Sequence, residues 1–148
     1  MAKYIDSLNK GLSAAKDAER NREEIAAIFR ELNEQLAIAT DGKVAIERIE
    51  FREPSVLPGL GLASIFDRKK YWALAVVFLP SKTVAPAEIA RWEQDNSGYP
   101  CRVMFGVDKY YCDDKAGLEG VLETLLADAA VGEVLHKYMT MPLPVTGN

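Results

Sequence analysis

The sequence predicts an α+β fold, an antiparallel sheet of about four strands with a long N-terminal helix and a C-terminal helix or helix pair packed on one face. Apolar residues recur at three- and four-residue steps near both ends, whereas alternating stretches lie between them without long helical crossovers. The composition, 49% hydrophobic and 27% charged over 148 residues, is typical of one globular domain. We expect that domain over residues 1–139, with 1–22 as a projecting helical arm and 140–148 as a flexible tail.

Residues 3–39 are predicted to form the first helix. Its second half carries one apolar stripe, made of Ile25, Ile28, Phe29, Leu32 and Leu36. Ile5, Leu8, Leu12 and Ala15 continue the stripe toward the N-terminus, interrupted at Gly11. The mixed charges of residues 16–24 cannot lie deep in a core, so we expect the helix to leave the domain body or break there. The run from Thr40 to Gly42 predicts its end.

Two strands are predicted next. In residues 44–53, Val44 and Ile46 share one face and Ile49 and Phe51 the other, which suggests a bulge near Glu47 and Arg48. Residues 71–79 have a bulky face and a small face, and therefore predict a central strand covered on both sides. The bulky face consists of Trp72, Leu74, Val76 and Phe78, and the small face of Ala73 and Ala75.

The C-terminal half is predicted to contain a short helix, a hairpin and a longer helix. Residues 86–94 begin with a proline and predict the short helix, with Ile89 and Trp92 facing inward. Residues 101–105 and 109–112 predict a hairpin that turns at Gly106 and places Cys101 opposite Cys112. Those cysteines are either two buried thiols or a pair that bridges on oxidation. Asp113 or Asp114 caps the last helical region, which continues to residue 139 with or without a kink near Ala130.

No residue pattern predicts a catalytic, cofactor-binding or metal-binding site. His136 is the single histidine, and no cysteine stands at metal-ligand spacing from it. The Gly59-Leu60-Gly61 run follows a proline and lacks the third glycine of a dinucleotide loop. Asp113 and Asp114 are better explained as helix-capping residues than as a carboxylate pair. We therefore expect no cofactor and lean against an enzyme.

The charge distribution disfavours nucleic acid as a partner. The net charge is −4, and no basic stripe is available to neutralise a phosphate backbone. The longest apolar run, residues 71–80, is half of what a membrane helix needs, and the N-terminus lacks a signal-peptide pattern. These features predict a cytoplasmic protein without a membrane segment.

The apolar loop of residues 54–70 and the first helix are the two features that suggest a function. Loops of this length are uncommon. The large apolar side chains of residues 54–70 either belong to the core or form an exposed patch for a partner. The helix, about 55 Å long, exceeds the width of such a domain. The partner-binding residues predicted on this basis are Leu57, Leu60, Leu62, Ile65, Phe66, Ile5, Leu8 and Leu12.

The function predicted from these features is a non-catalytic protein–protein interaction module, a homodimer that binds another, unidentified protein. An adaptor, an immunity-like protein or a phage-type accessory protein fits the size and acidity. A small acidic secretion chaperone is one alternative. A second is a small-ligand-binding domain or enzyme with residues 54–70 as a lid, and a third is a structural subunit of a larger assembly.

Overall fold

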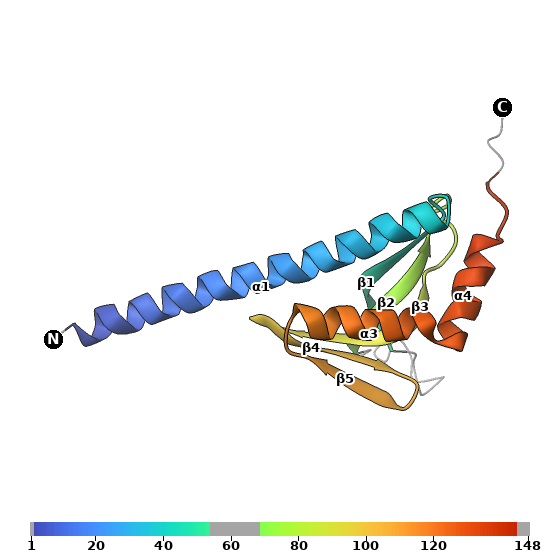
Figure 1. Ribbon diagram of the computed structural model, residues 1–148. Helices are drawn as coiled ribbons and strands as arrows, with labels where there is room; N and C mark the ends of the chain where they lie inside the picture. The colour runs from blue at the N-terminus through green and yellow to red at the C-terminus, as the bar shows by residue number, and fades with distance from the viewer. Residues whose placement is uncertain (1, 54–68, 145–148) are drawn as a thin grey trace, which may run out of the picture.

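The fold is α+β, as predicted, with helices packed on an antiparallel sheet (Figure 1). A computed structural model describes residues 2–53 and 69–144. The helices are α1 (Lys3–Ala39), α3 (Lys115–Ala127) and α4 (Ala129–Met139). The strands are β1 (Val44–Arg52), β2 (Lys70–Phe78), β3 (Ala87–Asp95), β4 (Gly98–Phe105) and β5 (Asp108–Cys112), and each pairs with the next along the chain.

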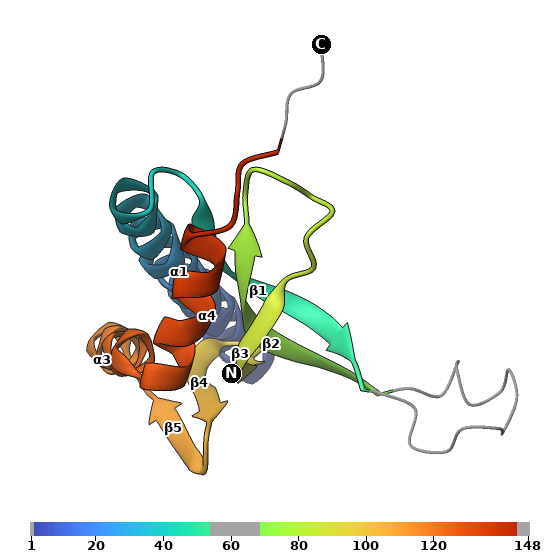
Figure 2. The same cartoon turned by 90° about the vertical axis from the view of Figure 1, so that its right-hand side faces the viewer.

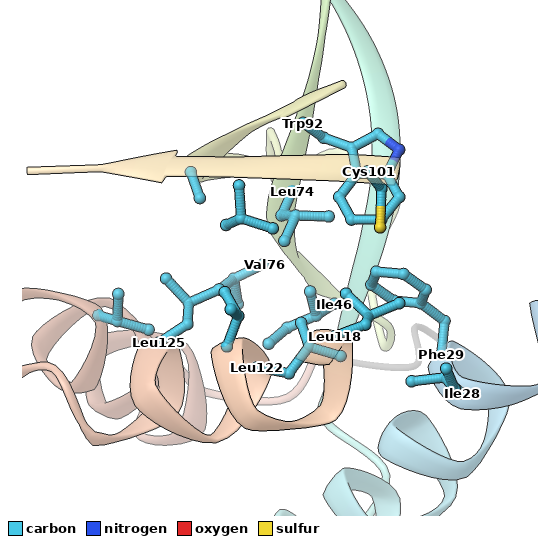
Figure 3. Close-up of a cluster of buried hydrophobic side chains, with 14 of the residues drawn as sticks. Ile28, Phe29, Ile46, Leu74, Val76, Trp92, Cys101, Leu118, Leu122 and Leu125 are labelled. Carbon is cyan, nitrogen blue, oxygen red and sulfur yellow. The ribbon is translucent and has the colours of Figure 1, made fainter. Parts of the chain in front are cut away.

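The core lies between the helices and one face of the sheet. Leu118, Leu122 and Leu125 of α3 point toward Leu74 and Val76 of β2 (Figure 3). Beside them, the ring of Phe29 meets that of Trp92 edge to face, with 5.4 Å between centroids. The bulky face predicted for β2 is therefore the face that the helices cover.

The small face of β2 lies on the opposite side of the sheet from the described helices. Ala73 is fully buried there, between its strand neighbours Ile49 of β1 and Arg91 of β3. Among the described residues, no helix provides the cover that the sequence predicts for this second face of β2.

The segment predicted as a short helix at residues 86–94 is strand β3, so the sheet has five strands rather than four. Ala90 and Trp92 are buried, whereas Arg91 and Glu93 between them are exposed, which is the period of two expected for a strand. Pairing with β2 on one side and β4 on the other overrides the local helix signal of the proline and alanines.

The bulge predicted in β1 near Glu47 is absent, because β1 and β2 pair without interruption from Val44–Phe78 to Arg52–Lys70. Ile49 and Phe51 do lie on the outer face, where Phe51 stacks on Tyr71. The register instead shifts between β2 and β3, at Leu74 and Ala75. The apparent change of phase in the sequence therefore reflects apolar residues on both faces of a regular strand.

The ends of the helices follow the predicted capping residues. Helix α1 ends at Ala39, where Asp41 and Gly42 adopt positive φ angles. The Asp114 carboxylate accepts a hydrogen bond from the Gly117 N–H at the start of α3. The last helical region breaks at Asp128, whose side chain caps α4. None of the described helices is long and apolar enough to cross a membrane.

Helix α1 also binds the edge strand of the sheet. Among the described strands, β1 is the first in the sheet order and pairs only with β2. The Asn33 side chain donates a hydrogen bond from Nδ2 to the Ile46 carbonyl and accepts one at Oδ1 from the Ile46 N–H, at 3.0 and 2.8 Å. A single side chain therefore satisfies both backbone groups that Ile46 turns away from β2.

Candidate functional site

The first half of α1 extends beyond the sheet as an exposed helix (Figure 1). No side chain between residues 2 and 24 is buried, and burial begins at Ile25. This segment, residues 3–24, is called the arm below. Its large apolar side chains are mostly in solvent, with Tyr4 79%, Ile5 60%, Leu8 59% and Leu12 52% exposed. Contiguous exposed apolar side chains are a feature of interaction surfaces, which makes the arm a candidate site.

The apolar stripe of the arm does not continue the core stripe of α1, contrary to the prediction. At about 100° per residue, the direction of Ile5, Leu8 and Leu12 differs by roughly a third of a turn from that of Ile25, Phe29 and Leu36. The helix is unbroken between them, so no kink restores the alignment. The arm therefore directs its apolar face sideways, toward the side of α1 on which Arg22 and Asn33 lie.

The base of the arm is held against the turn between β3 and β4. Asn21 Nδ2 donates a hydrogen bond to the Ser97 carbonyl at 3.2 Å, and Tyr99 Oη donates one to Glu24 at 2.8 Å. Burial and this hydrogen bond raise the pKa of Tyr99 above its usual value, so the hydroxyl remains a donor. Gly98 lies directly below the helix, where a Cβ atom would come within 2.6 Å of the Asn21 Cβ.

A groove of about 700 Å³ opens beside the arm base, on the helix side of the sheet. Its walls come from α1, from the three strands β1, β2 and β3, and from the turn after β3. The lining residues are Arg22, Arg48, Trp72, Trp92, Gln94, Asp95 and Asn96. Such a volume is in the range of small-molecule sites. We call it the Arg48 groove.

The two cysteines lie opposite each other in the β4–β5 hairpin, as the sequence predicts. Both are free thiols with no exposed surface, packed in the core. The neighbouring Cys112 thiol and burial both raise the pKa of the Cys101 thiol, which keeps that thiol protonated. A buried, protonated thiol is a poor nucleophile.

The other candidate residues for chemistry are dispersed. His136 is exposed on α4, and Asp114 is engaged as a helix cap. In the described ranges, 2–53 and 69–144, no group of three or more His, Cys, Asp and Glu side chains is placed to hold a metal ion.

The structure places only part of the predicted partner site. Ile5, Leu8 and Leu12 lie in one exposed row on the arm. Leu57, Leu60, Leu62, Ile65 and Phe66 lie outside the described residues.

Sequence reasoning missed the Arg48 groove, because its residues are scattered over three strands and a helix. The available signal was a charged residue, Arg48, on the strand face that also carries Val44 and Ile46.

No protein-family model, no curated protein and no solved structure matches this chain. What the molecule does must therefore be inferred from its own geometry.

Proposed function

We propose that this protein is a non-catalytic protein–protein interaction module that works as a homodimer, with two copies paired through the arm. The observation that supports this proposal is the exposed row of Ile5, Leu8 and Leu12 on a helix that its own domain leaves uncovered. Removing such side chains from water stabilises association by about 1.5–3 kcal/mol for each fully buried leucine or isoleucine. A second copy supplies a matching surface, as two-fold symmetry requires.

An antiparallel arrangement of the two arms is favoured over a parallel one. With Leu8 of one copy opposite Leu12 of the other, the leucines of the two rows pack on each other, and each Ile5 packs on Ala15 of the partner helix. Glu19, which continues the row toward the body, then lies beside the first turn of the partner helix, where Lys3 and the positive end of the helix dipole are located. Parallel pairing would instead place Glu19 against Glu19 and align the two dipoles.

The proposal predicts that charges placed on the apolar row separate the dimer. In the double variant Leu8→Asp, Leu12→Asp, four carboxylates enter the interface, and we expect the dimer dissociation constant to rise by roughly a hundredfold or more. Size-exclusion chromatography with light scattering measures this. The melting temperature of the monomeric body should change little, because these side chains lie outside its core.

The matched control adds the same charges to the far side of the arm, as Ser7→Asp, Ala14→Asp. Both positions are exposed and point away from the apolar row. We expect this control to remain dimeric. Wild-type protein that is monomeric at high micromolar concentration, or equal dissociation of both variants, would refute the proposed interface.

Disulfide trapping tests the direction of pairing. In the antiparallel arrangement Ile5 lies opposite Ala15 of the other copy, while two copies of Ile5 are about 15 Å apart, which is too far to bridge. We expect a mixture of Ile5→Cys and Ala15→Cys proteins to form a heterodimeric disulfide, and Ile5→Cys alone to remain uncrosslinked. The native Cys101 and Cys112 are buried and do not interfere. Efficient self-crosslinking of Ile5→Cys would indicate parallel arms.

A further inference from the structure

The Arg48 groove lies where the sheet forks. The pairing of β2 with β3 ends at Trp72 and Trp92. Beyond that pair, β1 and β2 continue together to Arg52 and Lys70, whereas β3 continues with β4 (Figure 2). The two halves of the sheet thus separate next to the arm base, and the side chains at the fork line a concave surface rather than a packed interface.

Arg48 is a half-buried cation without an ionic partner in the described part of the chain. Its guanidinium lies over the Phe29 ring, 4.7 Å from the centroid, and donates one hydrogen bond to Gln94 Oε1 at 3.2 Å. No described carboxylate lies within 4.0 Å of it. Burial lowers the pKa of Arg48 from its usual value, so its charged form would gain from a nearby anion. A guanidinium has five N–H donors, and Gln94 occupies one of them.

A second guanidinium, that of Arg22, reaches the same groove from α1. Its Nη1 donates to the Asn96 carbonyl, and no described carboxylate pairs with it. The acidic residue in the lining, Asp95, is 3.6 Å from Arg102, which also binds Glu93. The groove therefore carries more positive than negative charge, although the whole chain has a net charge of −4.

The apolar wall of the groove is Trp72. Half of its surface, 49%, is exposed, although its strand neighbour Trp92 is buried. A large indole that faces an open volume next to two cations offers a flat surface for an apolar or aromatic group. The same groove thus combines an anion-binding end with a surface for stacking.

We propose that the Arg48 groove binds a carboxylate with an adjacent apolar or aromatic group. The carboxylate accepts hydrogen bonds from the free N–H groups of Arg48 and Arg22, and the adjacent group packs on Trp72. A charge-assisted hydrogen bond to guanidinium is about twice as strong as a neutral one, which makes the carboxylate the main determinant of binding. The ligand is either a free small acid or an acidic side chain of another polypeptide. Binding of either ligand in the groove does not depend on dimerisation through the arm.

The test uses the full-length protein and two probes that differ in charge. N-acetylphenylalanine carries the carboxylate, whereas N-acetylphenylalaninamide is its neutral counterpart. The chain has two tryptophans, so a nitrogen-15 correlation spectrum contains two indole N–H signals, and Trp72→Phe identifies the one from Trp72. We expect the acid to shift the Trp72 signal in a saturable manner, and the amide to bind at least about tenfold more weakly.

Matched arginine variants test the two cations. Arg48→Gln should weaken binding of the acid at least about tenfold, while Arg30→Gln, which removes an exposed arginine from α1, should leave binding unchanged. Since Arg48 packs on Phe29, its variant is first checked for a wild-type melting temperature. Arg22→Gln should likewise weaken binding of the acid, and it replaces a side chain that is exposed on α1. Equal binding of acid and amide, or full binding by both Arg48→Gln and Arg22→Gln, would overturn the proposal.

Two further probes identify the source of the carboxylate. The peptide acetyl-Ala-Phe-Asp-Ala-amide carries it on an internal side chain, and the same peptide with asparagine does not. Binding of the aspartate peptide at least as tightly as N-acetylphenylalanine would indicate a polypeptide ligand, and binding of the free acid alone would indicate a small molecule. The Leu8→Asp, Leu12→Asp protein should bind as wild type does, which separates this proposal from that of the dimer.

Discussion

Leu74→Ala is expected to lower the free energy of unfolding by about 2–5 kcal/mol, because it leaves a cavity at the centre of the core. Leu74 has no exposed surface and lies under the α3 leucines (Figure 3). Total stabilities of domains are about 5–15 kcal/mol, so the loss is a large fraction of the whole. Urea unfolding followed by far-ultraviolet circular dichroism measures it.

A matched control for this substitution lies one residue beyond the end of β2. Leu79 is 49% exposed, and Leu79→Ala removes the same atoms without opening a cavity. We expect a loss of less than about 1 kcal/mol. Comparable losses for the two variants would mean that the helices do not cover the face of β2 that carries Leu74.

Gly98→Ala is expected to cost roughly 2–6 kcal/mol, from two separate causes. The φ angle of Gly98 is +95°, a conformation that costs a residue with a Cβ atom about 1–3 kcal/mol. The added Cβ would also lie 2.6 Å from the Asn21 Cβ and 3.1 and 3.2 Å from backbone atoms of Asn21 and Arg22. Because a helix backbone cannot shift as a flexible side chain can, overpacking adds about 1–3 kcal/mol.

Gly106 separates the two causes. It also has a positive φ angle, +62°, but an added Cβ there would meet nothing within 4 Å. Gly106→Ala should therefore show only the conformational cost, about 1–2 kcal/mol. Denaturant midpoints of the two variants give the comparison. If Gly98→Ala costs no more than Gly106→Ala, then α1 does not approach the β3–β4 turn as closely as the structure describes.

Elements with a long or repeated pattern were predictable from the sequence. The apolar repeat and the terminal Asp41 and Gly42 predicted α1 over its full observed length. The hairpin that places Cys101 opposite Cys112 followed from the turn at Gly106. These features depend on local periodicity and turn chemistry, which a single sequence contains.

Elements that depend on neighbouring strands were not predictable in the same way. β3 has a helix-like start and good helix formers, and its strand conformation comes from pairing on both sides. The Arg48 groove could not be predicted for a related reason. It exists only when the sheet brings Arg48, Trp72 and Gln94 together from three strands. The sideways direction of the arm, in contrast, was already contained in the spacing of Ile5, Leu8 and Leu12.

The paired hydrogen bonds between Asn33 and Ile46 have a consequence for how copies of this protein can meet. An exposed edge strand is a template for edge-to-edge pairing and aggregation. On β1 the backbone N–H and carbonyl of Ile46 are already occupied by the Asn33 amide, so α1 covers the start of that strand. A chain that added to this edge would have to displace the helix that anchors the core. The first half of β1 is therefore protected against pairing with a strand of another molecule.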